Sequence, residues 1–148
     1  RKYQTPIFLK VAPDLDTTDI DDMVDMTLKH KMNALIVSNT TISRPDLRSR
    51  FANETGGLSG APLRDLAQQR LRDFREASSG EIALIGVGGI SSAADAYARI
   101  RAGASLVQLY SALVFEGPML AKQINKGLLQ LLKRDGFQNI REAIGVDS

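Results

Sequence analysis

Four short apolar runs alternate with helix-like segments along this chain, and this alternation limits its possible folds more than any other feature. Each run has the length of a buried strand, and each segment between runs, apart from one long loop, opens a helix or places apolar residues at helical spacing. The predicted order is strand, helix, strand, long loop, helix, strand, helix, strand, helix. Such alternation favours right-handed crossovers onto one parallel sheet. The strand-like runs are residues 6–12, 34–37, 82–87 and 105–109.

Polar residues or glycines stand where each predicted strand ends, which is where (β/α)8 barrels keep their chemistry. Four strand–helix units are half of such a barrel, and 148 residues are too few for a whole one, which needs roughly 250. An open doubly wound sheet fits the alternation as well, but the first strand lacks the Gly-x-Gly-x-x-Gly turn typical of that fold. We therefore predict an α/β chain that supplies four βα units of a (β/α)8 TIM barrel.

The ends of the last two predicted strands favour a phosphate site. Gly88, Gly89 and two serines follow the third run, and Tyr110 and Ser111 follow the fourth. Helices that open at these residues would point bare N–H groups at one place, as anion sites require. In barrels, the loops after the seventh and eighth strands form such a site. The sequence therefore predicts a phosphorylated ligand.

Lys10 and the segment 38–41 are further candidates for ligand contact. An unpaired ammonium inside an apolar strand is costly, so we expect Lys10 to have a partner. That partner could be a carboxylate within the barrel or a ligand that becomes negative. The segment 38–41, Ser-Asn-Thr-Thr, could simply hydrogen-bond the start of a loop. Four polar groups in a row at a strand end nevertheless favour contact with a polar, planar ligand.

The stretch between residues 42 and 60 has no helical or strand periodicity. A loop of this length inside a compact domain is usually functional. Its glycines, Gly56, Gly57 and Gly60, could provide turns or could let a ligand approach the backbone closely. The sequence favours neither use over the other.

Composition argues against several other functions. The 19 basic and 17 acidic residues are spread along the chain without a basic block, so we expect no nucleic-acid partner. Cysteine is absent, and the single histidine, His30, lies between two lysines at a predicted helix end. We therefore expect His30 to be a solvated helix cap, and we expect no metal site. Tyr97, Phe115 and Phe137 are expected to pack in the core. No apolar run reaches the roughly 20 residues that a membrane span needs.

Taken together, five motifs resemble those of dihydroorotate dehydrogenase. They are LKVAPDL at 9–15, VSNTT at 37–41, ETGGLSGAPL at 54–63, GVGGISS at 86–92 and RAGASLVQLYS at 101–111. The long loop and the Glu-Gly-Pro at 116–118 resemble the class 2, quinone-dependent branch. The resemblance implies that residues 1–148 are the C-terminal half of a single FMN-binding (β/α)8 barrel domain, with no complete second domain.

The resemblance also implies a role for individual residues. Asn39 and Thr40 match the family's hydrogen-bonding partners of dihydroorotate. Ser38 and Ser111 stand where the family often has threonine, and both keep the hydroxyl group. The residues matched to FMN contacts are Lys10 at the pyrimidine edge of the ring, Ser38, Gly60, Gly89, and Tyr110 with Ser111 at the phosphate.

The implied reaction oxidises dihydroorotate to orotate in pyrimidine biosynthesis and passes a hydride to FMN and then electrons to a membrane quinone. The chain starts without a methionine, directly before its first predicted strand, so we expect it to be part of a longer protein. In class 2 enzymes the catalytic base is a serine in the other half of the barrel, so no catalytic residue is assigned here. None of Ser43, Ser49 and Ser59 lies in the matching motif.

An N-terminal extension in that missing part would contact the membrane. The parent protein would then be peripheral to a bacterial inner membrane, on its cytoplasmic side, or to the mitochondrial inner membrane. Two alternatives to this function remain open. One is another FMN-binding or sugar-phosphate-binding TIM-barrel enzyme, and the other is a non-catalytic half-barrel that covers its open sheet edges by self-association.

Overall fold

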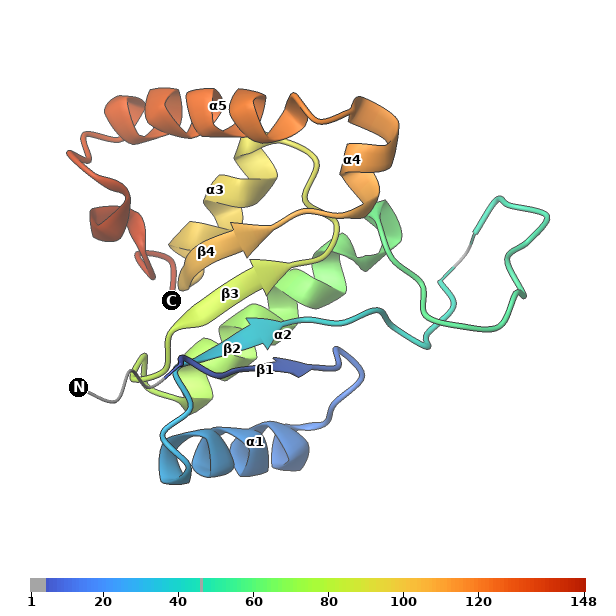
Figure 1. Ribbon diagram of the computed structural model, residues 1–148, viewed down its shortest axis with the longest axis horizontal. Coiled ribbons are helices and arrows are strands. Elements are labelled where there is room, and N and C mark those ends of the chain that lie inside the picture. The colour runs from blue at the N-terminus through green and yellow to red at the C-terminus, as the bar shows by residue number, and fades with distance from the viewer. Residues whose placement is uncertain (1–4, 46) are drawn as a thin grey trace.

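Four parallel strands form one sheet in the computed structural model, which describes residues 5–45 and 47–148 (Figure 1). The strands lie side by side in the order in which they follow one another along the chain. A doubly wound sheet would instead reverse its strand order at a switch point, so the order favours the barrel prediction. The strands are β1 (Phe8–Val11), β2 (Ala34–Val37), β3 (Leu84–Val87) and β4 (Ala104–Gln108).

The helices follow the strands as the sequence predicts, with one addition. A separate short helix, α4, precedes the final helix, which begins two residues after Pro118. Pro62 lies in a 3₁₀ turn, Ala61–Leu63, directly ahead of the second helix, and a second such turn spans Ile140–Ala143. The helices of the described residues are α1 (Thr17–Lys29), α2 (Arg64–Ala77), α3 (Ala93–Arg101), α4 (Ser111–Glu116) and α5 (Leu120–Arg134).

Helix ends follow local sequence signals. Asp16 caps α1, because its side chain accepts the N–H of Asp19 at 2.9 Å while the Asp19 side chain accepts the N–H of Asp16 at 3.2 Å. His30 is the exposed C-cap of the same helix, as predicted. Ser92 caps α3 by accepting the N–H of Asp95 at 3.1 Å.

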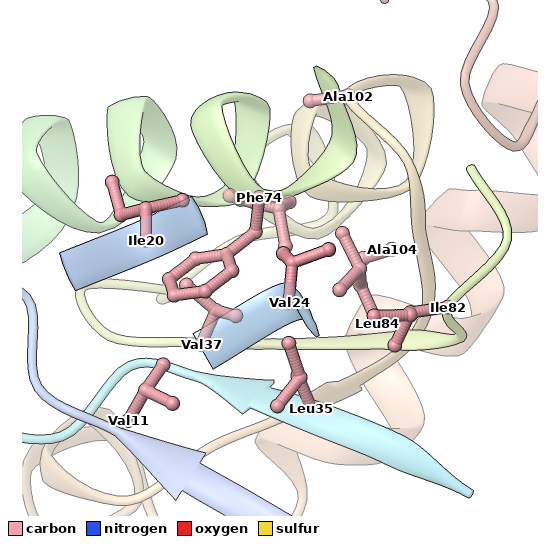
Figure 2. Close-up of a cluster of buried hydrophobic side chains, with 11 residues drawn as sticks. Val11, Ile20, Val24, Leu35, Val37, Phe74, Ile82, Leu84, Ala102 and Ala104 are labelled. Atoms are coloured by element: carbon pink, nitrogen blue, oxygen red, sulfur yellow. The ribbon is translucent and has the colours of Figure 1, made fainter. Parts of the chain in front are cut away.

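One face of the sheet, called here the outer face, packs against α1 and α2 (Figure 2). Leu35 and Val37 of β2 are fully buried beneath Phe74 of α2 and Val24 of α1. Alternate residues of a strand point to the same face, so this cluster takes every second residue of β1 and β2. Burial of these aliphatic side chains fixes which residues face away from the helices.

A second core lies between α3, α5 and β4. Tyr97 is buried in it and Phe137 packs against it, as predicted. Phe115 does not pack: its side chain is 84% exposed at the end of α4, so that expectation was wrong. Gly127 of α5 lies so close to Ala93 of α3 that a Cβ atom at position 127 would overlap the Ala93 side chain.

The opposite, inner face of the sheet is open in the described residues. Phe8 and Leu106 point to it and are 45% and 61% exposed. Lys10 shares the face of Phe8, and it too is exposed. The premise that Lys10 needs a partner because it is buried was therefore wrong. Helices cover this strand on only one side, so the ammonium group meets solvent.

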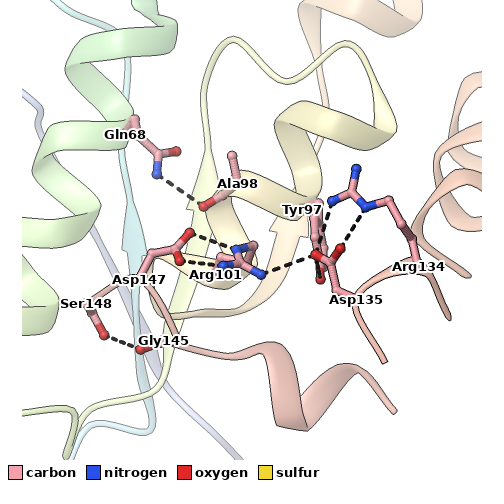
Figure 3. Close-up of polar contacts among 9 residues, drawn as sticks. All are labelled: Gln68, Tyr97, Ala98, Arg101, Arg134, Asp135, Gly145, Asp147 and Ser148. Carbon is pink, nitrogen blue, oxygen red and sulfur yellow. Dashed lines mark hydrogen bonds and ion pairs between the residues drawn. The ribbon is translucent and has the colours of Figure 1, made fainter. Parts of the chain in front are cut away.

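The C-terminal tail is fastened to the end of α3 through Arg101 (Figure 3). Arg101 contacts Asp147 at 2.6 Å and Asp135 at 3.3 Å. The Tyr97 hydroxyl donates to Asp135 at 2.9 Å. The N–H groups of Gly145 and Asp147 donate to the last carbonyl groups of α3 at 3.1 and 2.9 Å. These contacts hold the 3₁₀ turn against the second core.

Gly127→Ala is expected to destabilise the protein, although alanine is the better helix former. Overpacking against Ala93 costs about 1–3 kcal/mol, which exceeds the gain of about 1 kcal/mol in helix propensity. Chemical unfolding of the variant should therefore give a lower free energy of unfolding than the parent. Gln130→Ala, at an exposed position of the same helix, should change it by less than about 0.5 kcal/mol. A Gly127→Ala variant as stable as the parent would contradict the close helix contact.

Asp135 should make stability depend on acidic pH. Hydrogen bonds from Arg134 and Tyr97 lower the pKa of Asp135 to about 2, from 3.8. A lowered folded-state pKa contributes stability above the unfolded-state value and loses it as pH falls toward the folded one. The melting temperature of the parent should exceed that of Asp135→Asn at pH 6. By pH 3 about half of that difference should be gone. A difference that stays constant from pH 6 to pH 3 would contradict this contribution.

Candidate functional site

A cavity of about 320 Å³ lies at the carboxyl ends of the strands. It is lined by residues that follow β2, β3 and β4 and by Lys10 of β1. All eight residues matched to flavin or substrate contacts line it, although they come from five separate motifs, whereas Gly56 and Gly57 do not. The eight residues are Lys10, Ser38, Asn39, Thr40, Gly60, Gly89, Tyr110 and Ser111.

The end of β2 enters the cavity through Ser38 and Asn39. Ser38 is buried, and its N–H donates to the Val87 carbonyl at 3.2 Å. The N–H of Asn39 donates to the Val11 carbonyl at 2.7 Å, so both neighbouring strands hold this turn. The Asn39 side-chain oxygen accepts the Thr40 N–H at 2.9 Å. The amide nitrogen of Asn39 is left with two donors for a ligand.

Asp14 organises the following residues, a role that sequence reasoning missed. Its carboxylate accepts hydrogen bonds from the hydroxyl of Thr41, from the N–H of Ile42 at 3.0 Å and from the hydroxyl of Ser43 at 3.1 Å. Burial by itself would raise the pKa of Asp14, but these hydrogen bonds outweigh it and lower the pKa. The only sequence signal was the position of Asp14 just after β1, at the sheet edge that Thr41 also reaches.

The long loop folds back onto the end of β2. Thr41 and Leu58 exchange backbone hydrogen bonds of 3.1 and 2.8 Å. Arg44 crosses the loop and donates to the carbonyls of Glu54 and Gly56 at 3.0 and 2.5 Å. Gly57 lies against Thr40, so closely that any Cβ atom there would overlap the threonine side chain. Contact with the Thr40 side chain, rather than with a ligand, therefore requires glycine at position 57.

The loop after β3 is equally compact. Gly89 has a φ of +69°, and a Cβ atom there would lie 2.5 Å from the backbone of Arg64. The Arg64 side chain donates to the Gly89 carbonyl at 3.1 Å. Within the described part of the chain, the N–H groups of Gly89 and Ile90 donate to no protein acceptor. These two donors are consequently available to an anion.

Tyr110 and Ser111 complete the wall after β4. The Ser111 hydroxyl lies 2.8 Å from that of Ser59, so a hydrogen bond joins the long loop to the start of α4 in the cavity wall. The Tyr110 side chain is exposed at the rim. Lys10 is the one lysine, arginine, aspartate or glutamate among the described residues of the lining, so it dominates the charge of the site.

Residues 5–45 and 47–148 hold no group of three or more histidine, cysteine, aspartate or glutamate side chains placed to bind a metal ion. None of the helices in these ranges combines the length and the apolar character that crossing a membrane requires.

The chain is similar to proteins of one family. The family described as Dihydroorotate dehydrogenase matches residues 1–132. The dihydroorotate dehydrogenase (quinone) of Novosphingobium aromaticivorans is 58% identical over 141 residues, which are 95% of this chain and 40% of that protein. The protein of that name from Parvibaculum lavamentivorans is 53% identical over 148 residues, 99% of this chain and 42% of its own length. The chain thus spans about 40% of the length of these relatives.

Solved structures agree with the sequence comparison. Ligand-free DHODH from Eimeria tenella superposes with a TM-score of 0.94 at 42% identity, over 97% of this chain and 40% of that one. The complex of the Eimeria enzyme with ferulenol gives 0.92 at 43% identity, over 95% and 37% of the two chains. These likenesses confirm the predicted fold class, part of a TIM barrel. By its matched length and by its identity to these relatives, the chain belongs to the dihydroorotate dehydrogenase family.

Proposed function

We propose that this chain is the C-terminal half of the FMN-binding barrel of a quinone-dependent dihydroorotate dehydrogenase. The protein oxidises dihydroorotate to orotate in pyrimidine biosynthesis. One observation carries the proposal: eight residues from five separate motifs, matched individually to flavin or substrate contacts, line a single cavity. Such a coincidence of position is not expected from a shared fold alone.

The cavity suits FMN at both of its ends. The free N–H groups of Gly89 and Ile90 and the hydroxyl of Ser111 can hold a phosphate, since backbone donors at strand-to-helix turns bind anions. Lys10 lies on β1 of the same wall and supplies a positive charge. When bound, FMN would accept the hydride that leaves dihydroorotate. Gly60 belongs to the loop that covers the region between these ends.

Lys10 would favour negative charge on the flavin ring. An exposed ammonium on the inner sheet face has no competing carboxylate in the described part of the chain, so its charge is available to a ligand. Positive charge placed where negative charge develops lowers the barrier to its formation.

Asn39 and Thr40 would hold the substrate. The Asn39 oxygen is already occupied by the Thr40 N–H, so its two amide N–H donors suit the carboxylate or a ring carbonyl of dihydroorotate. Neither Ser43 nor Ser59 lies in a motif matched to the catalytic base, and their hydroxyls contact Asp14 and Ser111. That base, a serine of the other barrel half, therefore lies outside this chain in our proposal, as do the quinone path and the membrane contact. The intact protein would sit on a bacterial inner membrane, on its cytoplasmic side, or on the mitochondrial inner membrane.

The intact protein that the gene encodes should be yellow and should lose its flavin absorbance when dihydroorotate is added without oxygen. An added quinone should restore the absorbance. The 148-residue chain alone should not turn over dihydroorotate. A flavoprotein that dihydroorotate leaves unbleached would favour another FMN barrel, and a colourless protein would favour a sugar-phosphate barrel or a self-associating half-barrel.

Lys10→Ala in the intact protein should slow reduction of the bound flavin by dihydroorotate by about 10²-fold, because a charge that stabilises the reduced ring is lost. Stopped-flow absorbance measures this rate. Lys29→Ala, at the exposed end of α1, removes a lysine away from the cavity and should leave the rate unchanged. Equal rates for parent and Lys10→Ala would refute the role of Lys10.

A further inference from the structure

Arg99 of α3 is a buried cation that lies directly behind the Gly88–Gly89 loop. Its side chain is 2% exposed. The guanidinium donates to the Gln68 side-chain oxygen, to the Arg64 carbonyl at 2.6 Å and to the Gly88 carbonyl at 2.8 Å. Burial lowers the pKa of Arg99 to about 10, so the group still carries its charge at neutral pH. Burying a charge without a bonded carboxylate is costly, and packing alone would be served better by an apolar side chain.

The bond from Arg99 to the Gly88 carbonyl also orients the next N–H. A trans peptide is planar, with its C=O and N–H pointing in opposite directions. The N–H of Gly89 belongs to the same peptide unit as the Gly88 carbonyl, so it must point away from Arg99. Arg64 holds the Gly89 carbonyl in the same way, which turns the N–H of Ile90 away from Arg64. Neither of these two N–H groups has a protein acceptor in the described residues.

Arg64, which does not line the cavity, is itself held in place by side chains of the loop and of α3. It contacts the Asp95 carboxylate at 3.2 Å and donates to the Ser91 hydroxyl at 3.2 Å. Asp95 also accepts the N–H of Ser91 at 3.0 Å. The start of α2, the loop after β3 and the start of α3 therefore form one hydrogen-bonded unit. Arg99 joins this unit to Gln68, one turn further along α2.

We propose that Arg99 is a positioning residue for the phosphate of the flavin nucleotide. By holding the Gly88 carbonyl it fixes the Gly89 N–H toward the ligand, and its charge polarises that peptide from behind. It does so without touching the ligand, since it is absent from the cavity wall. Arginine suits this task because its planar guanidinium holds several N–H donors in a fixed fork, whereas the ammonium of lysine is a compact point charge. The inference rests on the proposed function. It specifies how the part of the cavity that would bind the FMN phosphate is held in place.

The test compares FMN with riboflavin, which has the same ring but no phosphate. Apoprotein is prepared from the intact protein, and the two dissociation constants are measured by quenching of flavin fluorescence. Arg99→Met should weaken FMN binding at least about tenfold, the effect of losing a charged hydrogen bond. Riboflavin binding should change by less than about threefold, since the ring contacts remain. Arg99→Lys keeps the charge but not the fork, and should weaken FMN binding by an intermediate factor.

Arg70→Met is the matched control. Arg70 is another partly buried arginine, on α2, and it donates to the Leu15 carbonyl at 2.8 Å without lining the cavity. Its replacement should leave the ratio of the two dissociation constants unchanged. Circular dichroism of each apoprotein verifies folding.

Equal losses of FMN and riboflavin affinity in Arg99→Met would show a general structural role and overturn the proposal, as would an unchanged preference for FMN. If Arg99→Met does not fold, the Arg99→Lys variant provides the test. A preference for FMN over riboflavin equal to that of the parent would then overturn the proposal. A parent protein that binds neither flavin would instead refute the proposed function itself.

Discussion

One-sided burial of the sheet is the constraint on which the rest of the structure depends. Aliphatic residues at alternate positions of β1, β2 and β3 pack against α1 and α2, and this packing fixes the register and direction of the strands. Because all four strands are parallel, their carboxyl ends meet at one edge. Segments far apart in sequence, such as Asn39 and Ser111, can therefore line the same cavity. The inner face that this packing leaves open carries Lys10.

The loops at that edge are held by polar contacts rather than by an apolar core of their own. Asp14 and Arg44 each bind several groups of the loop after β2, and Arg99 binds the Gly88 carbonyl of the loop after β3, so each stabilises one loop conformation among many. A carbonyl that is bonded to such a residue points away from the N–H of the same peptide, as at Gly88 and Gly89. Residues that do not line the cavity therefore help to determine which backbone groups face it.

The open inner face is consistent with membership in the dihydroorotate dehydrogenase family, whose members form TIM barrels. The chain matches about 40% of its relatives' length, and Phe8 and Leu106 remain exposed on the side that a barrel would enclose. The apolar residues of α4, including Val114 and Phe115, are exposed beside the cavity rim. Such exposure is expected of a chain that supplies part of a barrel.

The sequence by itself determined the elements and their order, because apolar periodicity, the Asp16–Asp19 capping box and the glycine-rich strand ends are local signals. The family resemblance of its motifs also singled out the eight residues around the cavity, and they meet there because parallel strands end at one edge. Only the tertiary structure decided that Lys10 is exposed and that Phe115 does not pack, since burial depends on which faces other elements cover. The same holds for Arg99, whose partners lie 11 or more residues away in sequence, where no periodic signal reaches.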